Sequence, residues 1–443
     1  MRLQSAIAAV ATFIILVAAI TITVFSQNQP PEKPSFETPL EKKTSEKTSE
    51  KGDSPENIPL PEGSYKHPDR FSPRPSKSIS KDEVERLKLA LHKASYFKPL
   101  ENGSVQCLLC PRHCFIKDGD RGACRVRANY GGTLYALTYG KPVALNNDPI
   151  EKKPLNHFLP GTKSLSVATI GCNFGCVFCQ NWHISQEYPE NGNHLDLIAY
   201  VSELLPDKKD LTQLLPSEIV QLAKLLNADS ISYTYTEPSV FFEYMLDTAK
   251  EARKAGLKNV WVTCGYLEEK PLHELCKYLD AANVDLKGFS EEFYSRYCGS
   301  TLAPVLKTLM ILKEEKVWFE ITNLVIPQAN DSDEMIRKMC VWIRENLGTD
   351  VPLHFSRFIP HYKLQDRPET PFATLQRAAK IAKEEGIKYV YIGNVWTKGV
   401  EDTLCPNCGK TIVKREFMNV LENNIKDGKC KFCNAPIPGV WSK

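Results

Sequence analysis

Fifteen cysteines most constrain what this chain of 443 residues can fold into, because eleven of them fall in three tight groups. Pairs with two or three residues between them converge naturally on one metal centre, whereas a secreted disulfide scaffold is much shorter and spaces its cysteines more widely. The pattern therefore predicts metal ligation. The groups are Cys107, Cys110, Cys114 and Cys124; Cys172, Cys176 and Cys179; and Cys405, Cys408, Cys430 and Cys433.

The overall composition predicts an ordinary globular protein of enzyme size. Hydrophobic residues make up 42% of the chain and charged residues 25%. A formal net charge of +3 is too close to balance to indicate a surface that binds a polyanion. Nucleic acid is therefore not expected as a partner.

The stretch from Ala6 to Phe25 is uncharged and apolar. About 20 such residues cross a bilayer as a helix, so residues 1–26 are predicted to form a transmembrane anchor. A cleaved signal peptide is the alternative, because small residues near Ser26 resemble a processing site, but its apolar core is usually shorter. Lysines that follow the span predict a single-pass protein whose catalytic domain faces the cytoplasm.

Residues 27–80 are rich in proline and contain a Lys-Thr-Ser-Glu repeat, so they are predicted to be a disordered linker. Globular sequence then begins with apolar residues at helical spacing over 82–97. We expect three further parts. They are an N-terminal helix and four-cysteine segment at 81–160, a core domain at 161–398 and a zinc-ribbon-like module at 399–443.

Strand-like and helical segments alternate through the core domain. Apolar strands that alternate with helices predict an α/β fold with a partial or full parallel (β/α) barrel, whose active-site residues gather at the carboxyl ends of the strands. The expected strands are 165–170, 230–236, 259–265, 283–286, 318–325, 352–358 and 389–393. The expected helices are 216–226, 240–255, 302–315, 332–346 and 374–385.

The central cysteine group, C-x3-C-x2-C, directly follows the first predicted strand. Three thiolates can ligate three irons of a [4Fe-4S] cubane, which leaves the fourth iron open to a small molecule. A structural zinc normally has four ligands, and His183 is the nearby alternative that would supply the fourth. The open iron makes chemistry the preferred interpretation.

This spacing resembles the signature of the radical S-adenosylmethionine (SAM) superfamily. The resemblance covers residues 105–441 and includes the segments DPIEKKPLNHFLPGT, YTYTEPSVFFEY, VDLKGF and HFSRFIPHYK. These segments are similar to the radical SAM enzyme of the AmmeMemoRadiSam system, which is related to pyruvate formate-lyase activating enzymes. The resemblance implies that SAM binds the open iron and is cleaved reductively to a 5'-deoxyadenosyl radical, which abstracts hydrogen from an unknown protein or small-molecule substrate. It also implies a reductant protein and Memo-like and AMMECR-like partners.

The resemblance assigns roles to five further residues. Phe178 is expected near the adenine, Thr236 and Glu237 at the SAM amino group, and Asp285 with Lys287 beside SAM and substrate as the catalytic pair. A carboxylate suits an ammonium group, which needs an acceptor and a countercharge. The alternatives are a helix cap for Glu237 and a structural ion pair for Asp285 and Lys287.

Two positions depart from the family pattern. Cys264 stands where the family usually has asparagine, and a thiol is too poor a hydrogen-bond partner to hold the SAM ribose. Gln328 stands where a glycine commonly follows Ile-Pro, which is expected only to reshape a turn.

The outer cysteine groups have complete sets of four ligands. The N-terminal group fits either zinc or a second iron–sulfur cluster. The two C-terminal C-x2-C pairs predict a structural zinc ribbon. Cys276, Cys298 and Cys340 lie outside the groups and are predicted to be small buried hydrophobes.

The sequence leaves two classes of function open and disfavours a third, a zinc-ribbon nucleic-acid binder, because the charge is balanced. The preferred one is a radical SAM enzyme, for which the sequence does not distinguish glycyl-radical activation from other radical modifications. The alternative is a membrane-attached, non-enzymatic iron–sulfur or zinc module for electron transfer or binding.

Overall fold

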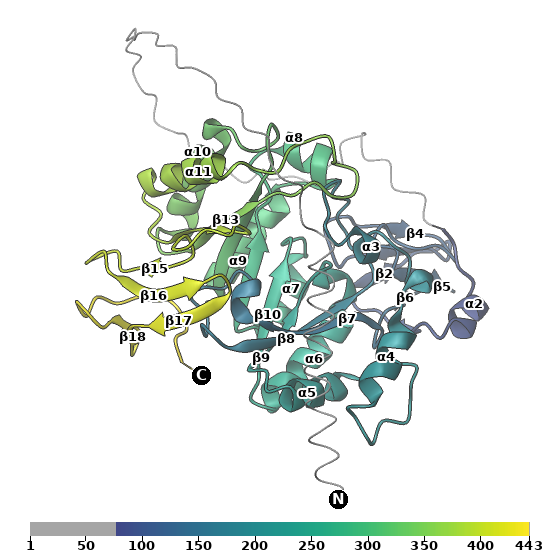
Figure 1. Cartoon of the computed structure of the whole chain (residues 1–443). Helices are drawn as coiled ribbons and strands as arrows, with labels where there is room; N and C mark the ends of the chain where they lie inside the picture. The colour runs from purple at the N-terminus through teal and green to yellow at the C-terminus, as the bar shows by residue number, and fades with distance from the viewer. Residues whose placement is uncertain (1–76, 443) are drawn as a thin grey trace, which may run out of the picture. The chain divides into compact units, whose positions relative to one another are not determined.

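A computed structural model describes residues 77–442, and an eight-stranded sheet organises it (Figure 1). The strand order is β14-β13-β12-β11-β10-β9-β8-β7, with β8 to β14 all parallel and β7 antiparallel to β8. The sheet is therefore a partial barrel with edges at β7 and β14. The strands are β7 (Pro142–Pro149), β8 (Lys163–Thr169), β9 (Ser230–Tyr233), β10 (Lys258–Thr263), β11 (Ala281–Asp285), β12 (Trp318–Val325), β13 (Leu353–Arg357) and β14 (Val390–Gly393).

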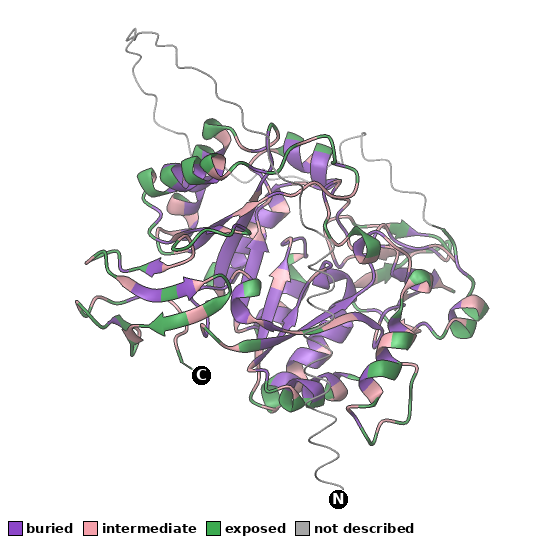
Figure 2. Cartoon of the chain, in the orientation of Figure 1, coloured by how far each residue is buried: buried purple, intermediate pink, exposed green. Residues whose placement is uncertain are grey.

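The seven predicted strands correspond to β8 through β14, which confirms the parallel α/β fold. These strands are largely buried, although several of their buried residues are polar (Figure 2). The sequence did not reveal β7, whose PVALNNDP combines two prolines with residues that strands disfavour. The antiparallel pairing with β8 stabilises β7 as a strand although its own composition does not favour one.

Five predicted helices form and cover the sheet, with their outer faces exposed (Figure 2). The predicted helix over 332–346 changes to a π-helix at Ile343–Leu347. Shorter helices were not predicted. The five are α5 (Pro216–Leu225), α6 (Phe242–Lys254), α9 (Ala303–Glu314), α10 (Asp333–Trp342) and α11 (Phe372–Glu384); the shorter ones include α3 (Trp182–Ser185), α4 (His194–Ser202), α7 (Glu269–Cys276) and α8 (Glu291–Phe293).

The predicted helix over 82–97 was wrong beyond its first turns. Only α2 (Lys81–Arg86) is helical, and Lys88 then turns the chain with a φ of 53°. β1 (His92–Lys93) pairs instead with β6 (Thr133–Ala136), so tertiary strand pairing overrides the local helical pattern. The remaining N-terminal strands are β2 (Phe97–Pro99), β3 (Val105–Cys107), β4 (Phe115–Ile116) and β5 (Arg127–Tyr130).

The turn at Gln328 keeps the shape that glycine would favour. Its φ is 60°, and its backbone N–H donates to Asp331. The expectation of a reshaped turn is corrected, because this hydrogen bond holds a side-chain-bearing residue in the left-handed region.

The C-terminal module brings its four cysteines together. The Sγ atoms of Cys405 and Cys433 lie 3.6 Å apart, and those of Cys408 and Cys430 lie 3.8 Å apart. All four sulfurs lie within 4.8 Å of one another, as metal ligation requires. The strands of the module are β15 (Thr403–Leu404), β16 (Thr411–Glu416), β17 (Asn419–Asn423), β18 (Ile425–Lys426) and β19 (Lys429–Cys430).

The predicted membrane localisation is corrected. Within residues 77–442 no helix has both the length and the apolar character to cross a bilayer. Helices α6 and α11 have 13 residues each, whereas a span needs about 20. The predicted span at Ala6–Phe25 and nearly all of the predicted linker lie outside the described residues. The prediction of a single-pass membrane protein with a cytoplasmic domain is therefore wrong for the part of the chain that the structure describes.

Candidate active site at the carboxyl ends of the strands

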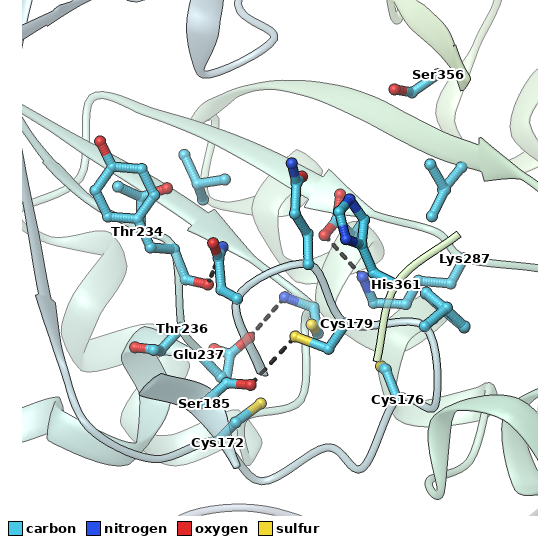
Figure 3. Close-up of a pocket in the computed structure, with 18 of the residues that line it drawn as sticks. Cys172, Cys176, Cys179, Ser185, Thr234, Thr236, Glu237, Lys287, Ser356 and His361 are labelled. Carbon is cyan, nitrogen blue, oxygen red and sulfur yellow. Dashed lines mark hydrogen bonds and ion pairs between the residues drawn. The ribbon is translucent and has the colours of Figure 1, made fainter. Parts of the chain in front are cut away.

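A cavity of about 560 Å³ lies where the parallel strands end (Figure 3). The loop after β8 supplies the central cysteines, and the ends of β9, β10, β11 and β13 supply polar side chains. The predicted residues of this region therefore share one cavity, although they span more than 100 positions of the sequence. They are Cys172, Cys176, Phe178, Cys179, Thr236, Glu237, Asp285 and Lys287.

The three cysteine side chains are held in place by their surroundings. The backbone N–H of Phe174 donates to Cys172 Sγ at 3.3 Å, and Cys179 Sγ lies 3.1 Å from Ser185 Oγ. Burial raises the pKa of Cys172 and of Cys179, while a hydrogen bond with Cys298, followed by burial, raises that of Cys176. A metal must therefore displace protons to bind these sulfurs.

This donor set fits the cluster that the sequence predicts. Three thiols line a cavity with room for a further ligand, as a cubane with one open iron requires. His183 is exposed and does not line the cavity, which disfavours a zinc site completed by that residue. Figure 3 shows Cys172 on the side of Glu237 and Cys176 on the side of Lys287.

Glu237 is fully buried and has two functions available to it. Its Oε1 accepts hydrogen bonds from the N–H and hydroxyl of Ser239 and from the hydroxyl of Thr263. Within residues 77–442, its Oε2 accepts a hydrogen bond from the backbone N–H of Cys264 alone, at 2.6 Å. Each carboxylate oxygen offers about two acceptor positions, so Oε2 keeps one. Glu237 is therefore a helix cap, as the alternative predicted, and can also accept an ammonium.

Asp285 and Lys287 form an ion pair on the cavity wall, with Lys287 Nζ 2.9 Å from Asp285 Oδ2. Burial lowers the pKa of Lys287, but the negative charge of Asp285 outweighs this effect and holds the pKa well above its usual value. The cavity therefore contains a permanent cation next to a half-exposed carboxylate. The ion pair exists as predicted, and its catalytic role stays a prediction.

Phe178 and Thr236 have mainly structural contacts of their own. The Phe178 ring packs near Phe293, and Lys287 Nζ lies 6.0 Å from its centroid. The Thr236 hydroxyl donates to the carbonyl of Thr169, which ties the end of β9 to β8. Phe178 thus presents an apolar surface to the cavity, and the Thr236 hydroxyl proton is already used.

Cys298, near the central group, was missed as a site residue, whereas Cys264 was noted only as a departure from the family pattern. Cys264 lines the cavity, and its thiol faces Lys287, Glu237 and Cys172. Cys298, predicted only as a buried hydrophobe, hydrogen-bonds Cys176 and ends a π-helix, a feature that often marks functional sites. The position of Cys298 along the chain carried no signal, because the fold alone brings this residue to the cluster loop.

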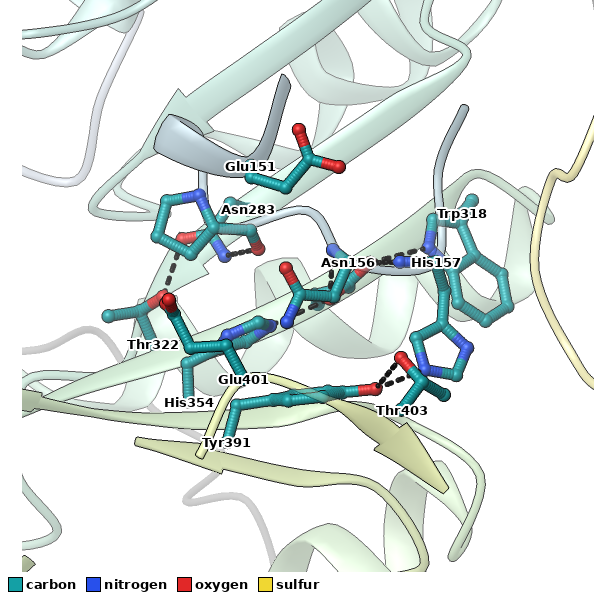
Figure 4. Close-up of polar contacts among 12 residues, drawn as sticks. Glu151, Asn156, His157, Asn283, Trp318, Thr322, His354, Tyr391, Glu401 and Thr403 are labelled. Atoms are coloured by element: carbon teal, nitrogen blue, oxygen red, sulfur yellow. Dashed lines mark hydrogen bonds and ion pairs between the residues drawn. The ribbon is translucent and has the colours of Figure 1, made fainter. Parts of the chain in front are cut away.

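A buried polar network lies on the strands of the same sheet (Figure 4). Glu320 on β12 accepts hydrogen bonds from the backbone N–H groups of Asn156 and His157 and lies 2.7 Å from His354 Nε2. His157 also contacts Tyr391 at 2.7 Å. These hydrogen bonds tie the segment before β8 to β12 and β14.

Glu401 borders this network, and we expect its carboxyl to make the stability of the protein depend on pH. Burial raises its pKa to about 7, despite the opposing charge of Arg415. The folded protein holds the proton of Glu401 more tightly than the unfolded chain does. The contribution of this protonated carboxyl to the free energy of unfolding is therefore complete below about pH 4.5 and is lost as the pH rises toward 7. We expect Glu401→Gln to flatten this decline in the free energy of unfolding, measured in urea between pH 5 and 8. Equal slopes for both proteins would contradict the assignment.

Comparison with known proteins agrees with the geometry of the cavity. Residues 166–340 match the Radical SAM superfamily. The uncharacterized protein MJ0808 of Methanocaldococcus jannaschii is 44% identical over 349 residues, which cover 78% of this chain and 99% of that protein. The chain belongs to the radical SAM superfamily.

More distant likenesses of this radical SAM protein include activating enzymes. The 4-hydroxyphenylacetate decarboxylase activating enzyme of Clostridium scatologenes is 24% identical over 119 residues, or 26% of this chain and 38% of that enzyme. The crystal structure of a domain of a pyruvate-formate lyase-activating enzyme from Bacteroides vulgatus shares 15% identity and covers 38% of this chain and 100% of the domain, with a TM-score of 0.34. Neither likeness assigns a substrate to the radical SAM protein described here.

Proposed function

We propose that this radical SAM protein is an enzyme that reductively cleaves SAM at a [4Fe-4S] cluster held by Cys172, Cys176 and Cys179. The observation that carries the proposal is the shared cavity, where three thiols lie beside a carboxylate with one free acceptor position. When bound, the cluster supplies the electron that converts SAM to the radical that takes hydrogen from a substrate. No observation on residues 77–442 favours the non-enzymatic alternative.

Different residues of the cavity would bind different parts of SAM and the substrate. Glu237 Oε2 accepts a hydrogen bond from the ammonium of SAM, and the four donors that already bond the carboxylate keep it from turning away. Phe178 offers an apolar face to the adenine. Lys287, held by Asp285, provides a fixed positive charge beside the reacting groups.

Anaerobic reconstitution with iron and sulfide, followed by SAM and dithionite, tests the proposal. We expect 5'-deoxyadenosine to form, measured by chromatography and mass spectrometry. Absence of the product from protein whose cluster is present and reduced, as shown by electron paramagnetic resonance (EPR), would refute the proposed reaction.

Glu237→Gln is expected to weaken SAM binding about tenfold, because it replaces a charge-assisted hydrogen bond by a neutral one. Equilibrium binding to the oxidised, reconstituted protein measures this change. Glu334→Gln, on the exposed face of α10, is the matched control and should leave the affinity unchanged. Equal affinities for all three proteins would place the SAM ammonium elsewhere.

The C-terminal cysteines are proposed to hold a structural zinc. A tetrahedral zinc with Zn–S bonds of about 2.3 Å separates its sulfurs by about 3.8 Å, and the observed 3.6 and 3.8 Å support this size of ion. We expect Cys408→Ala to lose about one zinc per chain and to increase proteolysis of residues 399–442 while iron content is kept. Loss of iron from this variant would instead indicate a cluster.

The substrate and partners are finer proposals. Glycyl-radical activation is favoured by the likeness to the 4-hydroxyphenylacetate decarboxylase activating enzyme over 119 residues. Membership of the AmmeMemoRadiSam system, with Memo-like and AMMECR-like partners and a reductant protein, rests on the sequence segments that resemble it. Copurification with candidate partners tests these assignments.

A further inference from the structure

The four N-terminal cysteines converge on one small cavity. Cys107 ends β3, Cys110 and Cys114 follow within the next seven residues, and Cys124 lies farther along the chain. All four line the cavity, and Cys107 and Cys124 are buried. Four sulfurs around one space are a complete ligand set, for a zinc ion or for a cubane.

The spread of these sulfurs distinguishes this set from the C-terminal one. Ligands of a single zinc crowd together, as Cys405, Cys408, Cys430 and Cys433 do within 4.8 Å. Among residues 77–442 no other set of three or more metal-binding side chains is gathered that closely. In a cubane each sulfur binds a different iron, so the four sulfurs stand farther apart than the ligands of one ion. The wider N-terminal set therefore favours a cluster.

The charges around the cavity also suit a cluster. A cubane with four thiolates is a buried anion, which needs compensation. Arg112 lines the cavity, and its positive charge acts on Cys110 and Cys114. The backbone N–H of Ala123 points to Cys114 Sγ at 3.5 Å, a contact of the kind that stabilises cluster sulfurs.

The N-terminal cavity lies directly against the loop of the central cysteines. Asn173, the residue after Cys172, lines it, and Arg112 donates to the carbonyl of Asn173. A Cβ atom on Gly171 would lie 2.8 Å from the carbonyl oxygen of Cys124, so the two loops touch backbone to backbone. The loops that carry the two cysteine sets are thus in direct contact.

We propose that Cys107, Cys110, Cys114 and Cys124 hold a second [4Fe-4S] cluster that relays electrons to the central cluster. The inference rests on the proposed function for the central site. In the relay, the N-terminal cluster is oxidised from the +1 to the +2 state while the central cluster is reduced from +2 to +1. Each transfer moves one electron from the N-terminal to the central cluster, without a proton or a change in bonding. A low-potential one-electron donor, such as a reduced flavin protein, then returns one electron to the N-terminal cluster.

The identity of the metal is tested without altering the N-terminal segment. Reconstituted wild-type protein should hold about eight irons and one zinc per chain, and Cys176→Ala about four irons and one zinc. The reduced variant should keep an EPR signal that does not respond to SAM. About four irons and two zincs in the wild type, or no cluster signal in the variant, would overturn the proposal.

The relay is tested by the rate at which the central cluster becomes reduced. With a reduced flavodoxin as donor, the central cluster should become reduced several-fold more slowly in Cys110→Ala than in the wild type. Freeze-quench EPR measures this rate. An equal rate would overturn the relay. A redox titration of the wild type is the second measurement, since an N-terminal cluster that stays oxidised while the central one is reduced cannot serve as donor. Absence of 5'-deoxyadenosine from wild-type protein with both clusters reduced would refute the proposed function instead.

Discussion

Cys176→Ala is expected to abolish the formation of 5'-deoxyadenosine. Cys176 is 6% exposed and is one of the three thiols of the cluster loop that line the cavity, with Cys172 and Cys179. Two sulfurs cannot hold a cubane with a single open iron, so both the central cluster and the site for SAM are lost. The product should fall to the level of a reaction without protein, measured by chromatography after anaerobic incubation with SAM and dithionite.

Cys340→Ala is the matched control for this variant. Cys340 is also fully buried, but it lies on α10 and does not line the cavity. The control should lose some stability through a small packing defect while its iron content and SAM cleavage stay at the wild-type level. Cleavage that persists in Cys176→Ala, or that disappears equally in both variants, would contradict the ligand assignment.

Arg127→Met is expected to lower the free energy of unfolding by about 3–5 kcal/mol. The guanidinium binds Glu243 through two hydrogen bonds of 2.8 and 2.9 Å, and the two side chains are 2% and 6% exposed. Glu243 also accepts from the backbone N–H of Ser95. Burial raises the pKa of Glu243, but Arg127 outweighs it and holds that pKa below its usual value. Without Arg127, a charge stays buried and unmatched between the N-terminal segment and α6.

The double variant Arg127→Met with Glu243→Leu separates the charge effect from simple loss of contacts. Replacement of both partners by apolar residues should recover most of the lost stability, measured by urea unfolding with the metal content determined on each sample. A cost below about 1 kcal/mol for Arg127→Met alone would show that water reaches Glu243 and that the ion pair is weak.

The parallel sheet could be predicted because strand-like segments alternate with helical segments along the chain. The cluster loop could be predicted because all its ligands lie within eight residues. The contacts of Cys298 with Cys176, and of Glu320 with His354 and the segment at His157, could not be predicted. They join residues that only the fold brings together, and each residue alone is of a type common in any core.

The segment at 82–97 was predicted wrongly for a different reason. Its helical spacing was real, but the hydrogen bonds from Ala90 to Leu137 and from Ala94 to Leu134 tie the chain to a neighbouring strand. Local periodicity competes with such pairings and loses when the partner strand is already in place. The order of elements was therefore predicted more reliably than the structure at the edges of the fold.

Gly171 sets a limit on how this protein can change over evolution. Its φ of 102° and the 2.5 Å that would separate a Cβ atom from Val126 leave no room for a side chain. The wall behind the first cluster ligand is thus made of residues from another sulfur-rich stretch of chain. A variant without that stretch would therefore have to rebuild the loop as well.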